Sequence, residues 1–271
     1  MGAVEDRLWV AAPEAQRVRG VAYAAAGVAL GASAGRLARF TAPVVTVVVA
    51  GSELRRIGRR IGDAAAVDLD RARAELPSLV GRDPSELDAS GISAAVIESL
   101  AENAVDAVVA PVFWGVVAGA PGAVAYRAIN TMDAMVGHRS ERYERFGWAA
   151  ARLDDVANWI PARLFAALVA AVSPSSARAS FEAVRTDATA HPSPNAGVAE
   201  AAVAGALGIE LGGTLRYGDR VEHRPTLGAG PRPTPADVVR AADLTSQAEW
   251  LLAGALAATW AAGYRAGRWR A

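Results

Sequence analysis

The sequence contains no cysteine and no lysine. The absence of cysteine excludes disulfides, thiolate nucleophiles, iron–sulfur clusters and cysteine-based zinc sites. The absence of lysine excludes the Gly-Lys-Ser/Thr phosphate loop found in many nucleotide-binding proteins. Arginine therefore supplies all 28 basic residues, which 28 acidic residues balance. A net charge of zero argues against a protein that binds nucleic acid over a broad basic surface.

Charged residues make up only 21 % of the chain, whereas hydrophobic residues make up 52 % of its 271 residues. This composition excludes a disordered chain, and the length suits one large domain or two small ones. Met1–Arg19 is charged throughout and lacks the apolar core of a signal peptide. Because there is no internal repeat and no linker, we expect one helical unit over residues 1–271.

Ala107–Tyr126 has no charged side chain and is long enough to cross a bilayer core of roughly 30 Å. Pro111, Gly115, Gly119 and Pro121 are expected to bend or break a helix there. Shorter charge-free runs suit buried helices equally well: Gly20–Gly35, Phe40–Ser52, Leu164–Ala177 and Trp250–Tyr264. The mean hydropathy of +0.19 leaves a membrane protein and a soluble core open.

Arginine and tryptophan flank several of these runs, as they do at membrane interfaces. The flanking residues are Arg55, Arg56, Arg59, Arg60, Trp159, Trp250, Trp260, Arg265, Arg268, Trp269 and Arg270. They favour the membrane interpretation over a solvated helix end.

Local signals predict several other elements. Leu54–Pro77 has the spacing of a solvated amphipathic helix, and Asp88 or Ser90 is expected to cap the helix that follows it. Two short alternating stretches around glycine pairs predict a small β-hairpin near residues 209–227.

The first candidate site is an acidic helical segment. On a helix, Glu98, Glu102 and Asp106 lie one turn apart on the same face. Like charges at this spacing repel each other, so a divalent cation such as Mg²⁺ is an expected partner. A solvent-exposed acidic stripe is the alternative, although Asp106 leads directly into the longest apolar run.

The second candidate site lies between Arg152 and Arg163. Asp154 and Asn158 are one helical turn apart, and Asp155 lies three residues before Asn158. These side chains could hold a metal–phosphate group, and Arg163 could bind a phosphate or carboxylate through two hydrogen bonds. A capped helix start with an acidic first turn would look similar.

The third candidate site is the segment His191–Gly197. Ser193 is expected to be the N-cap of a helix with Pro194 at its first position, and such a helix start can bind an anion. Ordinary capping explains Ser193 and Pro194 but not His191 or Asn195.

The fourth candidate site follows the long apolar run. Asn130, Thr131 and Asp133 would lie at an interface or at the mouth of a cavity, although a simple turn explains them almost as well. No zinc-type His/Glu helix motif occurs.

Taken together and in this order, four blocks resemble the adenosylcobinamide-phosphate synthase (CobD/CbiB) family of cobalamin biosynthesis. The blocks are ESLAENAVDAVVAPVFW from Glu98, YRAINTMDAMVGH from Tyr126, ARLDDVANWIPARL from Ala151, and HPSPNAG from His191 followed by LGIELGG. The resemblance runs from about Asp68 to Leu227, and four ordered blocks of this length make it specific.

The resemblance implies a mainly α, polytopic α-helical membrane protein of the inner cell membrane. Members of the family join aminopropanol, or its O-phosphate, to a propionate carboxylate of adenosylcobyric acid. The amide formation is coupled to ATP, the co-substrate, with Mg²⁺. The lipid bilayer is an expected partner, and a homo-oligomer or association with other cobalamin-assembly enzymes stays open.

The family's recurring polar residues fall on these segments, and we assign roles to them as our own hypotheses. Catalysis is expected from Glu98, Glu102, Asp187 and His191. Metal binding is expected from Glu98, Glu102, Asp106, Asp154, Asp155 and Asn158. Substrate or phosphate binding is expected from Asn103, Asn130, Thr131, Asp133, Arg163, Ser193 and Asn195. Histidine is the residue type best suited to deprotonate the incoming ammonium near neutral pH.

One departure from the family pattern concerns the N-terminus. Family members usually begin with an additional apolar helix carrying Asp-Pro and His-Pro elements, and this sequence starts downstream of it. We therefore expect a single membrane-embedded synthase domain that lacks the family's first helix.

Two other functions stay open. A membrane prenyltransferase would hold a diphosphate through Mg²⁺ at Asp154, Asp155 and Asn158, with a lipid diphosphate in place of a corrinoid and an amine. A non-enzymatic scaffold for corrinoid assembly would leave the carboxylates dispensable.

Overall fold

The computed structural model describes residues 5, 8–9, 12–37, 41–137, 142–217 and 220–265. His138 of the second quoted block and the flanking Arg268, Trp269 and Arg270 lie outside these residues, as do the side chains of Trp260 and Arg265. The described chain is mainly α-helical with one two-stranded antiparallel sheet, which confirms the predicted secondary structure class.

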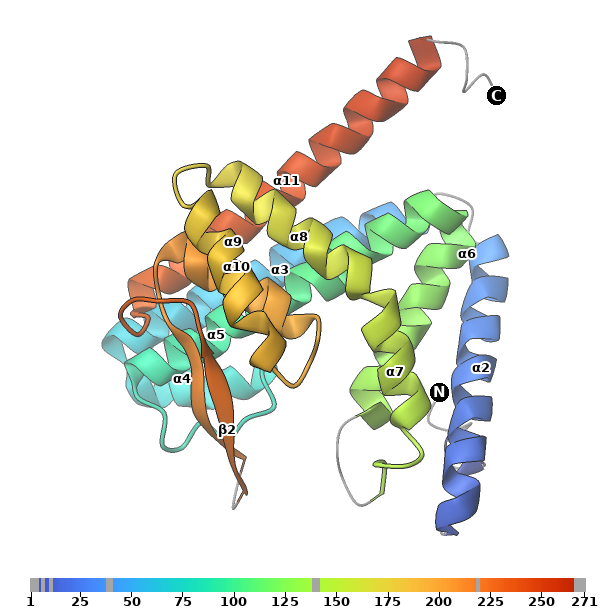
Figure 1. The fold of residues 1–271 in the computed structure, drawn as a ribbon, viewed down its shortest axis with the longest axis horizontal. Coiled ribbons are helices and arrows are strands. Elements are labelled where there is room, and N and C mark those ends of the chain that lie inside the picture. Colours follow the sequence, from blue (N-terminus) through green and yellow to red (C-terminus); the bar gives the residue numbers. More distant parts are fainter. Residues whose placement is uncertain are drawn as a thin grey trace. The chain divides into compact units, whose positions relative to one another are not determined.

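The helices and strands follow one another along the chain as shown in Figure 1. They are α2 Pro13–Leu37, α3 Thr41–Val67, α4 Leu69–Glu75, α5 Ala89–Ala104, α6 Ala110–Met132, α7 Trp148–Ala157, α8 Trp159–Val172, α9 Ala177–Thr186, α10 Ala196–Leu207, β1 Leu211–Tyr217, β2 Arg220–Leu227 and α11 Pro235–Arg265. Two π-helical turns, η2 Val105–Val109 and η3 Asp133–Gly137, adjoin α6, and the short 3₁₀ turns are η1 Leu76–Ser78 and η4 Ala188–Ala190.

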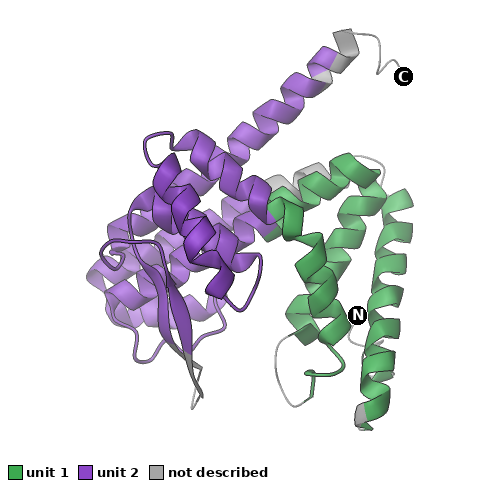
Figure 2. Ribbon diagram, viewed as in Figure 1, with its two compact units in different colours: residues 1–50, 106–161 green, residues 51–105, 162–271 purple. Residues whose placement is uncertain are grey.

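The chain divides into two compact units, which Figure 2 colours separately. Unit 1 comprises residues 1–50 and 106–161, and unit 2 comprises residues 51–105 and 162–271. Each unit is described by itself below. The expectation of a single domain over residues 1–271 stays a prediction.

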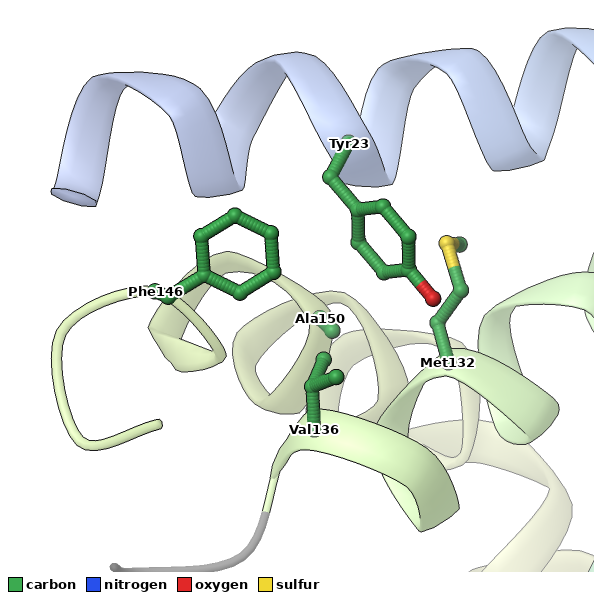
Figure 3. Packing of buried hydrophobic residues seen from close by; sticks show 5 residues of the cluster. All are labelled: Tyr23, Met132, Val136, Phe146 and Ala150. Carbon is green, nitrogen blue, oxygen red and sulfur yellow. The ribbon is translucent and has the colours of Figure 1, made fainter. Parts of the chain in front are cut away.

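The core of unit 1 lies where α2 meets the segment around α7 (Figure 3). Tyr23 of α2 packs on Phe146 with ring centroids 5.3 Å apart, and Met132, Val136 and Ala150 complete the cluster. Burial of such large apolar side chains supplies most of the free energy that holds helices together.

Glycines allow α2 to approach its neighbours closely. A Cβ atom on Gly31 would lie 2.9 Å from the carbonyl oxygen of Val124, and one on Gly35 would lie 2.5 Å from Cα of Pro121. A Cβ atom on Gly20 would overlap the carbonyl oxygen of Phe146. The glycines on this face of α2 therefore determine how closely the helix packs on α6 and on the residues preceding α7.

The apolar run of α6 is broken where the sequence predicts. Ala118 (φ −130°, ψ 16°) and Gly119 (φ 65°, ψ −162°) leave the helical region, two residues before Pro121. A positive φ strongly favours glycine, and proline cannot donate the hydrogen bond of a continuous helix. Pro111 lies at the start of α6, where the ring is tolerated.

Unit 2 packs α5 against α10 and α11. The α5 helix begins at Asp88, whose side chain accepts a hydrogen bond from the N–H of Gly91, so the first of the two predicted caps is confirmed. The predicted helix Leu54–Pro77 is interrupted, because Asp68 ends α3 and caps α4 by accepting from the N–H of Arg71.

The predicted hairpin is confirmed as β1 and β2. The strands are antiparallel, with Leu211 opposite Leu227, and a bulge falls between Gly212 and Gly213. Both glycines have positive φ, at 77° and 91°. The preceding helix α10 ends at Gly208 in the left-handed conformation, which glycine adopts without strain.

One helical stretch, Ala89–Gly137, is long and apolar enough to cross a membrane. The pair α7 and α8, bent by 41°, passes the same test when the two helices are taken together. These tests rest on length and composition, and a buried helix of a soluble protein passes them too.

We expect Gly20→Ala to lower the free energy of unfolding by about 1–3 kcal/mol, because the added methyl group overlaps the backbone at Phe146. Gly115→Ala is the control within the same unit, since its Cβ atom would meet only the Ala123 side chain at 3.7 Å. That variant should be neutral or more stable by up to about 1 kcal/mol. Thermal unfolding of both variants measures the difference, and equal midpoints would contradict the packing argument.

Candidate functional site

A partly buried network of carboxylates and amides lies within unit 1, centred on Asp106. Its Oδ2 accepts a hydrogen bond from Nδ2 of Asn130 at 3.0 Å. Its Oδ1 accepts from Nδ2 of Asn158 at 3.1 Å and lies 3.4 Å from the hydroxyl of Tyr126. Residues from η2, α6 and the end of α7 thus converge on one carboxylate.

Asn158 joins the two acidic segments. Its Nδ2 also donates to Oδ2 of Asp154 at 3.0 Å, and its Oδ1 accepts from the hydroxyl of Tyr126 at 2.8 Å. Asn158 is only 2 % exposed and Tyr126 only 1 %, so these bonds form away from water. The predicted one-turn pairing of Asp154 with Asn158 is confirmed.

The π-helical turns position the two acids that flank α6. Each turn contains one residue more than an α-helical turn, and such turns are frequent at functional sites. Asp106 lies in η2, where its backbone carbonyl accepts a hydrogen bond from Arg127 Nη1 at 3.2 Å. Asp133 lies in η3, and a Cβ atom on Gly137 would overlap its carboxylate.

Acidic side chains gather around Asp154 in this network. Asp133 acts electrostatically on Asp154, and Arg127 donates to the backbone carbonyl of Asp106. Oδ1 of Asp154 is buried and has no hydrogen-bond partner in the part of the chain that the structure describes. A cationic ligand group would suit this oxygen.

The acids of the first candidate site do not form one cluster in the structure. Glu98 is 3 % exposed, forms an ion pair with Arg82, and accepts the N–H of Gly212 at 2.9 Å. It therefore connects α5 to the loop before it and to the hairpin. Glu102 is exposed, and the extra residue of η2 ends the 3.6-residue spacing before Asp106 is reached.

Within the described ranges, no group of three or more histidine, aspartate or glutamate side chains is close enough to hold a metal ion. The residues present therefore do not fit a preassembled magnesium site. Thr131 is exposed, and Asp155 pairs with exposed Arg152 at 3.3 Å. Asn103 donates to the carbonyl of Ser99 at 2.9 Å.

The third candidate site forms a turn in unit 2. The N–H of Ser193 donates to Nδ1 of His191 at 3.1 Å, and Oγ of Ser193 accepts the N–H of Ala196 at 3.1 Å. Ser193 caps the turn as predicted, but α10 begins at Ala196 and not at Pro194. Arg163 Nη1 donates to Oδ1 of Asn195 at 3.3 Å, which joins the end of the second predicted motif to the third.

The carboxylate of Asp187 accepts hydrogen bonds from a backbone N–H group and from a hydroxyl group. Its Oδ2 accepts the N–H of Gly228 at 2.9 Å, and its Oδ1 accepts the hydroxyl of Thr186 at 2.6 Å. This carboxylate therefore fastens the end of the hairpin to the segment after α9.

Glu200 is a buried acid that the sequence analysis missed. It lies on α10, is 2 % exposed, and its Oε2 is 3.7 Å from Nε2 of His191. Burial raises the pKa of Glu200 well above its ordinary value, and the charges of Glu98 and Glu102 raise it further. The available signal was one acid in an otherwise small and apolar helix, AGVAEAAVAGAL.

Comparisons with known proteins agree with the resemblance. A family model described as CobD/Cbib protein matches residues 2–245. The chain is 50 % identical over 209 residues to "Cobalamin biosynthesis protein CobD" of Mycobacterium tuberculosis strain H37Rv, covering 76 % of this chain and 67 % of the relative. The chain therefore belongs to the CobD/CbiB family.

Two further relatives carry the same printed name. The Rhodobacter capsulatus protein is 52 % identical over 199 residues, covering 72 % of this chain and 63 % of its own length. The Chromobacterium violaceum protein is 44 % identical over 265 residues, covering 93 % of this chain and 84 % of its own length. No solved structure matches. The chain thus spans about two thirds or more of these relatives, and the predicted role in cobalamin biosynthesis is confirmed.

We expect Asn158→Ala to lower the free energy of unfolding by about 1–3 kcal/mol, because it leaves Tyr126 and two buried carboxylates without a shared partner. Arg152→Gln, which breaks an exposed ion pair on the same helix, should change it by about 0–1 kcal/mol. Urea unfolding compares the two, and equal losses would show that the network is not stabilising.

The raised pKa of Glu200 predicts a pH dependence of stability. Glu200 holds its proton to a higher pH in the folded chain than in the unfolded chain, where it is released above about pH 4.3. The contribution of Glu200 to the free energy of unfolding therefore falls as the pH rises from about 4.3 toward the pKa of Glu200 in the folded chain. Glu200→Gln should remove that part of the slope between pH 5 and pH 8. Denaturant midpoints across this range test it, and an unchanged slope would contradict the assignment.

Proposed function

We propose that this chain catalyses the adenosylcobinamide-phosphate synthase step of cobalamin biosynthesis. In this reaction an amide bond forms between a propionate carboxylate of adenosylcobyric acid and aminopropanol or its O-phosphate. Membership of the CobD/CbiB family is the observation that carries the proposal, and it favours this reaction over the prenyltransferase and scaffold alternatives.

The network of unit 1 supports a role in binding a cation. The carboxylate oxygen Oδ1 of Asp154 is buried, and the charge of Asp133 acts on the same carboxyl group. A buried carboxylate oxygen favours a positively charged partner, and either the ammonium of the amine substrate or the Mg²⁺ that accompanies ATP would supply it. We assign cation binding to Asp154 first, since its Oδ1 is buried and has no hydrogen-bond partner among the described residues.

ATP enters the proposal as the co-substrate that activates the carboxylate. A corrin carboxylate oxygen would bond to the γ-phosphorus while ADP leaves, and the amine nitrogen would then bond to the acyl carbon while phosphate leaves. The ammonium must first lose a proton to a base. His191 is the residue that the sequence predicts for this role, but its side chain is buried and its Nδ1 accepts the N–H of Ser193, so we give it a structural role first. Magnesium arrives with the triphosphate in this scheme, because Mg²⁺ commonly combines one or two carboxylates with phosphate oxygens.

The turn of unit 2 supports a role in binding phosphate oxygens. The N-terminus of α10, the hydroxyl of Ser193 and the guanidinium of Arg163 are adjacent. Helix starts and guanidinium groups both favour anions. Glu98 and Asp187, in contrast, are engaged by an arginine and by backbone N–H groups, so we give them structural roles first.

A polytopic location in the cell membrane is part of the proposal. Ala89–Gly137 and the α7–α8 pair are its candidate spans. Large apolar side chains on the surface of unit 1 support it, since water disfavours them and lipid does not. The exposed ones include Val18, Val21, Leu30, Val116, Val117, Trp148, Val156, Trp159 and Ile160.

The direct test supplies the detergent-solubilised chain with adenosylcobyric acid, ATP, Mg²⁺ and either aminopropanol or aminopropanol phosphate. Mass spectrometry follows cobinamide or its phosphate. We expect product with one of the two amines, and Asp154→Asn should lower kcat/KM by at least about 100-fold, the loss typical when a charge-stabilising group is removed.

Glu144→Gln is the control, because Glu144 is an exposed acid of the same unit. It should leave turnover unchanged. Raising the amine concentration should rescue Asp154→Asn if the cation is the ammonium, and raising Mg²⁺ should rescue it if the cation is the metal. Full activity of Asp154→Asn would refute the assignment of the site.

A further inference from the structure

Glu200 lies where a carboxyl group is costly. It is on α10, whose residues from Ala196 to Gly205 are all buried, and it is itself 2 % exposed. An isolated charge at such a position is strongly unfavourable, so a buried acid needs a partner or a proton. The polar atom at its carboxyl group is Nε2 of His191, at 3.7 Å, and Arg82, Arg224, Glu98 and Glu102 act on it electrostatically.

The absence of a side chain at Gly197 of α10 leaves room for the imidazole ring of His191. A Cβ atom on Gly197 would lie 2.5 Å from Cβ of His191 and 2.9 Å from its Cγ. Only glycine therefore lets the ring lie against the first turn of the helix. Glu200 follows Gly197 by three residues on the same face, and the side chain of His191 is only 4 % exposed.

The hydrogen bond at the other ring nitrogen selects a tautomer. The backbone N–H of Ser193 is directed at Nδ1 of His191, and a backbone N–H can only donate. The carbonyl of Ser193 is equally close to Nδ1, but a proton on Nδ1 would leave the Ser193 N–H without its acceptor. The neutral ring therefore carries its proton on Nε2, the nitrogen that faces Glu200.

We infer that Glu200 is a positioning residue, whose buried carboxyl group lies 3.7 Å from Nε2 of His191, electrostatically favours a proton on that nitrogen and thereby holds the His191–Asn195 turn in place. The inference rests on the proposed function, because this turn carries the groups assigned to phosphate oxygens. Nδ1 of His191 accepts the N–H of Ser193, Oγ of Ser193 accepts the N–H of Ala196 at the start of α10, and Arg163 donates to Asn195 and to the carbonyl of Pro194. The carboxyl group acts through the ring and contacts no substrate.

The first test reads the tautomer directly. The chain has three histidines, so ¹⁵N-histidine NMR of the full solubilised chain is simple, and His138→Asn and His223→Asn variants assign the signals. We expect the neutral imidazole of His191 to carry its proton on Nε2. A proton on Nδ1, or an even mixture of the two forms, would overturn the inference without any change at Glu200.

The second test separates positioning from proton transfer. Glu200→Ala should populate both tautomers and raise the KM for the phosphate-bearing substrate by about tenfold, the effect of one lost polar contact, with little change in kcat. Glu200→Gln keeps an acceptor oxygen and should restore both the tautomer and KM. Glu182→Gln, an exposed acid on α9, is the control and should resemble the unaltered chain.

The outcomes are distinct. An unchanged tautomer in Glu200→Ala, or a Glu200→Gln variant that loses kcat while KM stays constant, would overturn the positioning role. If Glu200→Ala does not fold, the tautomer of the unaltered chain and the kinetics of Glu200→Gln decide. A chain that makes no product while its His191 signals behave as expected would refute the proposed function and leave the positioning of His191 intact.

Discussion

The structure depends on how a chain without lysine accommodates carboxylates that are buried or partly buried. In unit 1, the amide of Asn158 does this by donating to Asp106 and Asp154 while accepting from Tyr126. Amide groups carry no charge, so they satisfy hydrogen bonds without neutralising the acids. The helices of unit 1 are therefore joined by amide and hydroxyl groups around the carboxylates of Asp106 and Asp154.

Unit 2 meets the same constraint with different means. Glu98 forms an ion pair with Arg82 and accepts the N–H of Gly212, whereas Glu200 faces His191 and has a pKa that burial raises. A buried acid with an arginine partner fixes local structure, since removing one member leaves an unpaired charge. Amide groups in unit 1 and an arginine and a histidine in unit 2 thus accommodate the acids in different ways.

Local signals in the sequence were enough to predict much of the fold. The cap at Asp88, the hairpin and the break at Gly119 follow from short-range chemistry and agree with the structure, whereas the helix predicted to start at Ser193 begins three residues later, at Ala196. The pairing of Asp154 with Asn158 follows from helical spacing alone. The sequence predicted one helix over Leu54–Pro77 and missed the break at Asp68. A residue that caps a new helix inside a periodic segment leaves the amphipathic pattern unchanged.

The convergence of Asp106 with Asn158 could not be predicted in the same way. It depends on the π-helical turn η2 and on contacts between segments 52 residues apart, and neither leaves a local pattern. A regular helix would keep Glu98, Glu102 and Asp106 in line, and the extra residue ends that register. Glu200 escaped notice because a single acid among alanines looks like a surface residue until the burial of α10 is known.

The break at Gly119 also bears on the proposed membrane location. An unbroken helix over the 49 residues of Ala89–Gly137 would be about 74 Å long, more than twice the thickness of a hydrocarbon core of roughly 30 Å. The break divides this length into limbs of about 45 and 27 Å. In the proposed membrane location, two limbs that both cross the bilayer would return the chain to the side from which it entered, so one glycine would set the parity of the topology.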